Sequence, residues 1–257
     1  MNRTLLHYLG HSTFRIVTES GKTILLDPFI EGNPQCPLEL EQIREADMIL
    51  VTHGAQDHMG QAVELALATG ATLVSGPDVR VHAISRGIPE ERTRVLAWGG
   101  EIDVMGVRTR SLKADHLSFF KSGDGYLSSI AMSFLITTPA GLSIYAMGDS
   151  SIFQDLQLFG QLYRPQVGLM PVGGFPGFFT EISPREAALA ASWLGLNLAV
   201  PVHYTADPEN GERFREICAA LVPRMEVEVM APGDSLGLVP RSTQVVERIP
   251  AGEGRDG

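Results

Sequence analysis

The chain has 257 residues, and 44% of them are hydrophobic, which is enough to build a sizeable core. Acidic residues outnumber basic ones by 30 to 20, and no cluster of Lys and Arg interrupts this balance, which argues against a nucleic-acid-binding protein. We expect no signal peptide, because residues 1–10 lack a basic segment followed by a long apolar one. We also expect no membrane span, because no stretch approaches the ~20 apolar residues that a membrane helix needs. Cys36 and Cys218 lie far apart and predict reduced thiols in a cytoplasmic protein.

Short runs of apolar and β-branched residues predict strands along most of the chain. The first three, residues 5–9, 14–17 and 23–26, are separated by turns and suggest an antiparallel group. Further strands are expected at residues 48–52, 71–75, 107–112, 130–137, 142–147, 167–172, 198–202 and 227–230. Several of these runs are apolar throughout, which is typical of strands that are covered on both faces.

Three helices are predicted between these strands. Residues 61–69 end at Gly70, which is a common stop signal. Ser183 opens a capping box with Pro at the first helical position, and residues 212–221 carry apolar side chains at helical spacing. The order of elements predicts an α/β (α+β) fold in one domain over residues 1–240, with two sheets covered by outer helices. The polar, Gly-rich segment 241–257 predicts a flexible tail.

Imidazole and carboxylate side chains follow four of the predicted strands. They are His53, Asp57 and His58 after residues 48–52, His116 after 107–112, Asp149 after 142–147 and His203 after 198–202. Unrelated polar residues in surface loops would explain any one of them. Strand ends that meet at one rim of a sheet are a usual place for a site, however, and imidazole with carboxylate suits zinc, manganese or iron. The repeated pattern therefore predicts a metal centre.

Short motifs spread over nearly the whole chain, from about residue 5 to about residue 238, match those of one family in order. They are Leu9-Gly10-His11-Ser12-Thr13-Phe14, Leu26-Asp27-Pro28-Phe29, Thr52-His53 through Asp57-His58, Gly148-Asp149, Pro171-Val172-Gly173-Gly174 and Pro201-Val202-His203-Tyr204. The chain resembles the metallo-β-lactamase superfamily. Within it, the chain is similar to the bacterial branch that contains L-ascorbate-6-phosphate lactonase. The resemblance implies a four-layer αββα sandwich with the site along one edge.

The resemblance also implies one or two divalent metal ions, zinc or manganese. Carried over from the family motif, the ligands are His53 and His116 for the first ion, Asp57, His58 and His203 for the second, and Asp149 as a bridge between them. Ala55 stands where the family has a second His, and a methyl group cannot bind a metal. We therefore expect the second ion to bind first and more tightly, with the first site weak, empty or completed by water.

Four further residues are expected near the ions. His11 supports a ligand or contacts the substrate, unless it is only a hydrogen-bonded turn histidine. Asp27 orients a ligand histidine or belongs to an Asp-Pro turn. Tyr204 donates a hydrogen bond to an oxyanion or packs in the core. Phe175, in a Phe-rich segment after Gly173-Gly174, forms an apolar wall beside the ions or anchors a loop.

The resemblance implies a metal-dependent hydrolase that acts on an ester, lactone, amide or phosphodiester of a small molecule, with lactonase-like activity favoured. The attacking group is hydroxide, because a metal lowers the pKa of bound water from about 15.7 to about 7. Asp57, His53 and His116 are the catalytic candidates, since Asp57 can take a proton and an unliganded His titrates near neutrality. Because of Ala55, two alternatives stay open: a lyase or isomerase that uses a single metal ion, and a non-catalytic relative. The chain could also form a homo-oligomer.

Overall fold

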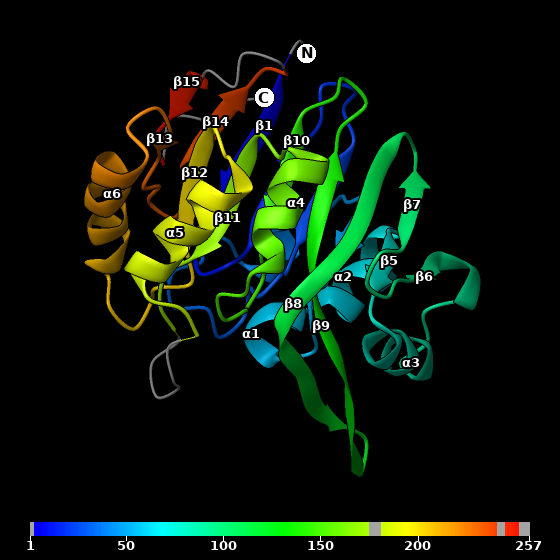
Figure 1. Ribbon diagram of the computed structural model, residues 1–257. Coiled ribbons are helices and arrows are strands. Elements are labelled where there is room, and N and C mark those ends of the chain that lie inside the picture. Colours follow the sequence, from blue (N-terminus) through cyan, green and yellow to red (C-terminus); the bar gives the residue numbers. More distant parts are fainter. Residues whose placement is uncertain (1–2, 175–180, 241–244, 252–257) are drawn as a thin grey trace.

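The computed structural model describes residues 3–174, 181–240 and 245–251, and two sheets form its centre (Figure 1). The first sheet contains, in spatial order, β15 (Val245–Ile249), β14 (Ser235–Leu238), β1 (Thr4–Tyr8), β2 (Phe14–Val17), β3 (Thr23–Leu26), β4 (Met48–Leu50), β5 (Thr72–Ser75) and β6 (Thr93–Val95). The second contains β13 (Glu226–Val227), β12 (Leu198–Val202), β11 (Val167–Pro171), β10 (Ser143–Ala146), β9 (Gly125–Thr137), β8 (Val107–Ser122) and β7 (Glu101–Val104).

Each sheet is antiparallel on one side and parallel on the other. In the first sheet, β15 to β3 pair antiparallel, and β3 to β6 pair parallel. In the second, β7 to β10 pair antiparallel, and β10 to β13 pair parallel. The parallel strands β11 and β12 are buried on both faces, as their continuous apolar runs predict.

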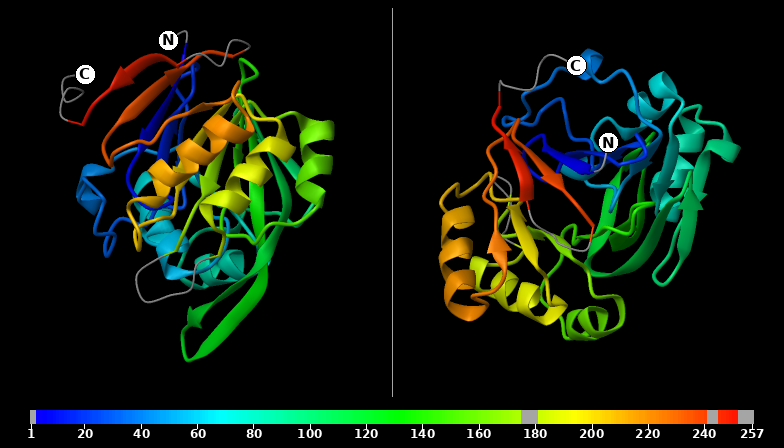
Figure 2. Two further views of the ribbon diagram at one scale, coloured as in Figure 1. Left: turned by 60° about the vertical axis from the view of Figure 1, so that its left-hand side comes forward. Right: turned by 90° about the horizontal axis from the view of Figure 1, so that it is seen from above.

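Helices cover the outer faces, and the main core lies between the sheets (Figure 2). On the first sheet, α2 (Ala62–Thr69) and α3 (Pro77–Ser85) pack against the outward side chains of β3, β4 and β5, and the short α1 (Gln56–Met59) precedes them. On the second sheet, α4 (Asp155–Tyr163), α5 (Pro184–Leu194) and α6 (Asn210–Leu221) form a second apolar layer with β10, β11 and β12. Single 3₁₀ turns occur at Leu40–Gln42 and Glu90–Arg92. The expected layers of helix, sheet, sheet and helix are confirmed.

Several elements were not predicted from the sequence, among them α1, α4, β6 and β7. Two further features differ from the elements that were predicted. β8 and β9 run far beyond the predicted strands. Past a register shift, their paired ends, residues 117–130, form a two-stranded arm that projects below the sheets in Figure 1. Exposed and buried residues alternate along much of β8 because one face of the arm packs on the body, so no continuous apolar run marks this part of the strands. β15 lies within the segment expected to be a tail, and it pairs antiparallel with β14.

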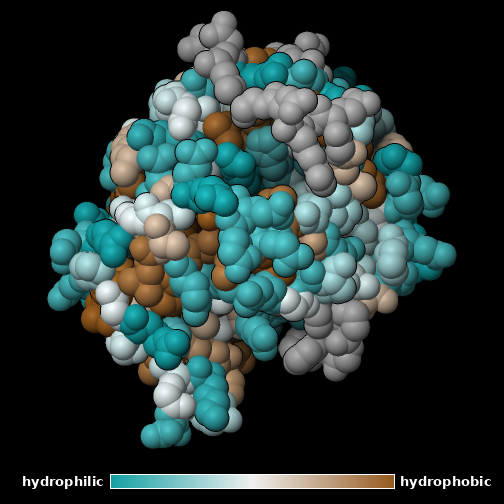
Figure 3. Space-filling model, turned by 180° about the vertical axis from the view of Figure 1, so that it is seen from behind, coloured by the Kyte–Doolittle hydropathy of each residue, from teal (hydrophilic) through white to brown (hydrophobic). Residues whose placement is uncertain are grey.

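The surface is mixed in character. Viewed from behind in Figure 3, most of the face is polar, and brown apolar patches gather toward the lower left. The arm carries three of the exposed large apolar side chains, Leu117, Phe119 and Tyr126, and the last two stack with their ring centroids 5.0 Å apart. None of the helices in the described ranges is long and apolar enough to cross a membrane.

Candidate metal centre

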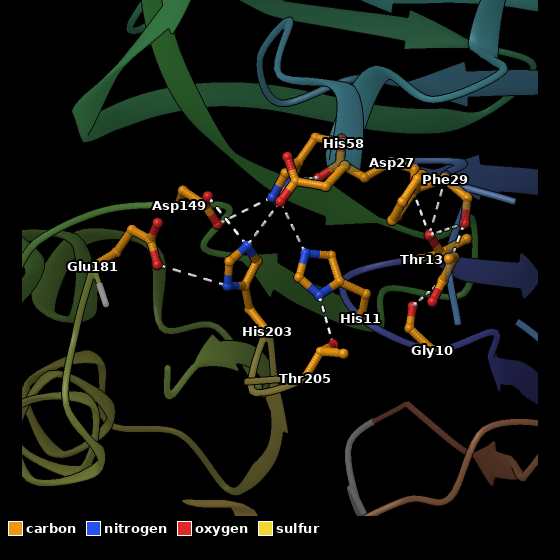
Figure 4. A network of polar contacts seen from close by, with 12 residues as sticks. Gly10, His11, Thr13, Asp27, Phe29, His58, Asp149, Glu181, His203 and Thr205 are labelled. Atoms are coloured by element: carbon orange, nitrogen blue, oxygen red, sulfur yellow. Dashed lines mark hydrogen bonds and ion pairs between the residues drawn. The ribbon is translucent and has the colours of Figure 1, made fainter. Parts of the chain in front are cut away.

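Loops at the strand ends of both sheets meet at one edge of the sandwich, and Figure 4 shows five of the predicted residues gathered there: His11, Asp27, His58, Asp149 and His203. His11 follows β1, and its carbonyl oxygen accepts a hydrogen bond from the backbone N–H of His203, just after β12. The loop after β4 joins the second sheet through the N–H of Met132, which donates to the carbonyl oxygen of Thr52. Backbone hydrogen bonds between the sheets therefore align the loops that carry the site.

Four side chains form the centre of the cluster. Asp149 lies between two imidazoles, with its Oδ1 3.1 Å from His58 Nε2 and its Oδ2 3.3 Å from His203 Nε2. Asp57 Oδ2 is 3.5 Å from the same His203 nitrogen. The side chain of Asp149 is 5% exposed and that of Asp57 is 24% exposed, so one carboxylate is enclosed and the other opens to solvent. These are the four residues that the sequence assigned to the second ion.

The three residues assigned to the first ion also lie together. One donor atom from each of His53, His116 and Asp149 falls within 4.8 Å of the others, and the centroids of the two rings are 5.1 Å apart. Asp149 contributes to both groups, as a bridging ligand would. Ala55 stands at the N-cap of α1, with the exposed Gln56 after it, so this stretch leads into the helix that carries Asp57 without adding an imidazole.

The Nδ1 atoms of three buried imidazoles are held from outside the cluster. His58 Nδ1 is 2.8 Å from Asp27 Oδ2, His53 Nδ1 is 3.1 Å from Thr52 Oγ1, and His11 Nδ1 is 3.0 Å from Thr205 Oγ1. Because the Thr52 hydroxyl donates to Asp27, its lone pair is left to accept from His53. A proton on Nδ1 leaves a lone pair on Nε2, which is the atom that faces the cluster.

His11 lies closer to the centre than its position in a turn implies. Its side chain is fully buried, its Nε2 is 3.1 Å from Asp57 Oδ2, and its ring centroid is 4.0 Å from that of His203. One donor atom of His11 also falls within 4.8 Å of donors from Asp57, His58 and His203, so His11 belongs to the same group of possible metal ligands.

Three of the site residues have left-handed backbone conformations. The φ angles are +56° at His11, +44° at Asp27 and +58° at His203. Residues with a Cβ rarely adopt this region, which costs about 1–3 kcal/mol each and is concentrated at functional sites. The surrounding hydrogen bonds thus hold these loops in one arrangement at the expense of backbone strain.

The donor atoms fit a divalent cation. Among the residues that the structure describes, the following atoms of the cluster are buried without a hydrogen-bond partner: Nε2 of His53, His58 and His203, Oδ1 of Asp149, Oε2 of Glu181 and Nδ1 of His203. Buried polar groups in proteins are otherwise almost always paired, and an ion is one of the explanations for an exception. The three Nε2 atoms approach carboxylate oxygens of Asp149 at 3.1, 3.3 and 3.9 Å, as ligands of a shared ion would.

The charges in the cluster are strongly coupled. Burial alone would lower the pKa of His58, but the carboxylates of Asp149 and Asp27 hold it well above 6.5. Burial likewise opposes protonation of His203, yet Asp149 raises its pKa to about 10. Although burial favours the neutral form of Asp149, His203 and His58 keep its pKa well below the usual value. His53 differs, because burial holds its pKa well below 6.5. The enclosed carboxylates therefore require positive charge beside them, from protons or from a metal.

One residue of the centre was missed from the sequence. Glu181 has a side chain that is 7% exposed, and its Oε2 is 3.7 Å from His203 Nδ1. Burial, together with the charge of Asp149, raises the pKa of Glu181 to about 7. It follows no predicted strand, and its place two residues before the capping serine Ser183 gave no signal beyond a helix start.

Two other residues were expected near the ions, Phe175 and Tyr204. Phe175 is outside the described residues. Tyr204 is buried in the apolar layer with α5 and α6, and its hydroxyl lies close to Gly211 on α6, so the packing interpretation describes its position.

Comparison with known proteins agrees with this geometry. A family model described as a beta-lactamase superfamily domain matches residues 5–203. A UPF0173 metal-dependent hydrolase from Rubrobacter xylanophilus is 39% identical over 239 residues, which is 91% of this chain and 96% of the relative. Igni18, a metallo hydrolase from Ignicoccus hospitalis, is 28% identical, with a TM-score of 0.78 over 92% of this chain and 98% of its own. YhfI of Bacillus subtilis, a metallo-beta-lactamase fold protein, is 12% identical and shares the fold, with a TM-score of 0.66 over 92% of this chain and 100% of its own.

The matched segment spans the cluster from before His11 to His203, and the identity to the Rubrobacter protein extends over most of both chains. The chain therefore belongs to the metallo-β-lactamase superfamily and, within it, to the family of UPF0173 metal-dependent hydrolases.

Proposed function

We propose that this chain uses one or two divalent ions, zinc or manganese, to hydrolyse an ester, lactone, amide or phosphodiester bond, with a lactone as the favoured substrate. The observation that carries the proposal is the set of buried Nε2 and carboxylate atoms that face one another and have no hydrogen-bond partner among the described residues. Such donors are costly to bury in a protein unless an ion or another partner occupies the space between them.

The two ions would be held unequally. The tighter site has four donors, from Asp57, His58, His203 and Asp149. Asp27 fixes the His58 ring by accepting a hydrogen bond from its Nδ1. The other site has three donors, because Ala55 offers none. One of these, His116, is only half-buried, and its ring has no hydrogen-bond partner within the described parts of the chain. The larger number of donors and the hydrogen bond between His58 and Asp27 both favour filling of the Asp57 site first.

The exposed edge of the cluster is where substrate would react. A bound divalent ion supplies Lewis acidity there, polarising a carbonyl or phosphoryl oxygen and lowering the pKa of a coordinated water to about 7. Asp57 is the carboxylate of the cluster that reaches solvent, so it is placed to take up a proton from the attacking water. His116 is the imidazole of the cluster that is open to solvent and can pass a proton between substrate and bulk water.

The substrate would be a small molecule, since the net charge of −10 opposes a polyanionic nucleic acid. Cys36 and Cys218 are both free thiols, which fits a reducing compartment, and we place the reaction in the cytoplasm.

Metal content and hydrolysis should be measured on the same untagged protein. Inductively coupled plasma mass spectrometry would give the metal per chain before and after incubation with zinc or manganese. Initial rates on a panel of lactones, aryl esters, an amide and a phosphodiester would follow. Metal-dependent turnover with lactones hydrolysed fastest supports the proposal. A chain that takes up no metal, or metal-loaded protein that is inert on the whole panel, would refute it.

A single-ion version of the reaction makes a separate prediction. If only the Asp57 site is filled, His116→Ala should abolish turnover while the bound metal stays largely intact. His82→Ala is a suitable control, because His82 is also partly exposed but contacts Ser122 on the arm instead of the cluster. Loss of the metal from the His116 variant would contradict the single-ion version.

A further inference from the structure

We propose that Glu181 is a positioning residue of the tighter metal site: its carboxylate accepts a hydrogen bond from His203 Nδ1 and thereby keeps His203 Nε2 directed at the ion. The inference rests on the proposed metal-dependent function. It assigns a role to a residue that lies far from His203 in the sequence and that belongs to none of the sequence motifs.

The first support is the pattern of the other imidazoles. His58, His53 and His11 each have Nδ1 within hydrogen-bond distance of an oxygen outside the cluster. His203 is the buried imidazole of the cluster that departs from this pattern, because its Nδ1 has no hydrogen-bond partner in the described part of the chain. Outer partners of this kind fix the tautomer and ring orientation of metal-binding histidines. A partner at His203 Nδ1 would complete the arrangement.

The second support is the position of the Glu181 carboxylate. Its Oε2 is 3.7 Å from His203 Nδ1 and, within the described residues, is itself buried without a hydrogen-bond partner. In Figure 4, Glu181 lies on the side of the His203 ring opposite His11, with the dashed line leading to Nδ1. Hydrogen bonds of this type span about 2.7–3.2 Å, so a movement of less than about 1 Å by either side chain would complete the contact.

The third support is that Glu181 is attached to a rigid element. Ser183 caps α5, and Glu186 closes the capping box by accepting from the backbone N–H of Ser183. Ile182, which follows Glu181, is buried in the apolar layer under α5. The backbone that carries Glu181 is therefore anchored on one side by helix capping and packing, which limits how far its carboxylate can move from His203.

The test compares two changes at this position. Glu181→Leu removes the acceptor but keeps a side chain of similar bulk, whereas Glu181→Gln keeps an acceptor oxygen and removes the charge. Glu216→Leu makes the same chemical change on the exposed face of α6 and serves as the control. Zinc affinity would be measured by competition with a fluorescent chelator, and the visible absorption of Co²⁺-loaded protein would report ligand geometry.

We expect Glu181→Leu to weaken binding of the tighter ion by about 10–100-fold, the range found for outer partners of metal ligands, and to change the Co²⁺ spectrum. Metal content at saturation should be unchanged, and Glu181→Gln should lie between this variant and the parent. Equal affinities for the Glu181→Leu and Glu216→Leu proteins would overturn the inference. So would loss of a full equivalent of metal in both Glu181 variants, because Glu181 would then be a ligand itself.

Two further results separate the possible failures. If the Leu variant does not fold, Glu181→Asp withdraws the acceptor by one methylene, and an unchanged zinc affinity in that protein would also overturn the inference. A parent chain that binds zinc and hydrolyses substrate, with unaffected Glu181 variants, would disprove only the role of Glu181. A parent chain that binds no metal would disprove the proposed function together with it.

Discussion

Replacing Asp27 by Asn tests whether this residue sets the tautomer of His58. The Asp27 carboxylate is buried and accepts three hydrogen bonds at 2.8 Å, from the Thr52 N–H, the Thr52 hydroxyl and His58 Nδ1. Asparagine has the same shape and tolerates the positive φ at this position. Only one of its two terminal atoms is an acceptor, however, so the three donors can no longer all be satisfied.

The fixed donor decides how the amide turns. The Thr52 N–H cannot reorient, so the oxygen of the introduced amide should face it, and the NH₂ group should face His58 Nδ1. His58 can then accept at Nδ1 only by carrying its proton on Nε2, the atom that faces the ion. We expect Asp27→Asn to weaken binding of the tighter ion by about 10–100-fold, which is about 1.4–2.8 kcal/mol. The metal-free protein should lose about 1–3 kcal/mol of stability, the range for leaving a buried donor or acceptor unsatisfied.

Chelator competition would measure the first quantity and urea unfolding of the metal-free protein the second. Asp47→Asn is the matched control, because Asp47 also accepts from a backbone N–H, that of Thr23, and from Lys22, and it belongs to no part of the cluster. The control should lose stability without losing metal affinity. If Asp27→Asn keeps a zinc affinity close to that of the parent, the tautomer argument is refuted.

Three other predictions follow from single positions. A Cβ on Gly54 would overlap the Phe120 ring, so Gly54→Ala should lower the free energy of unfolding in urea by about 1–3 kcal/mol. Most of this loss should vanish in a Phe120→Ala background, because the ring that clashes is then absent. Additive effects of the two substitutions would contradict the prediction. Burial, with the charge of Arg15, lowers the pKa of His7 to about 4. The folded state therefore resists protonation of His7, and stability is lost as the pH falls from about 6.5 toward 4. Relative to His7→Gln, the parent should lose about 1–2 kcal/mol of unfolding free energy between about pH 7 and pH 5, and parallel pH profiles of the two proteins would disprove this. Ala55→His should raise the metal content toward two ions per chain or tighten the weaker one, and an unchanged titration would show that position 55 does not face the ion.

Much of the centre could be predicted from the sequence, for a physical reason. Parallel strands buried on both faces need continuous apolar runs, so the polar residue that ends each run marks the edge of the sheet. His53 after β4, Asp149 after β10 and His203 after β12 were all visible in this way. The capping box at Ser183 likewise predicted the start of α5, because its hydrogen bonds are local.

The tertiary structure decided what depends on contacts between distant segments. His11 reads as a turn residue until the pairing of its carbonyl with the His203 N–H brings its ring beside Asp57. Glu181 reads as part of a helix start until α5 packs on the second sheet and places it behind His203. Local sequence records the propensity of a segment and the faces it buries. The partner of a buried polar atom is set by the packing of whole elements, and in this protein those partners determine how the imidazoles of the centre are held.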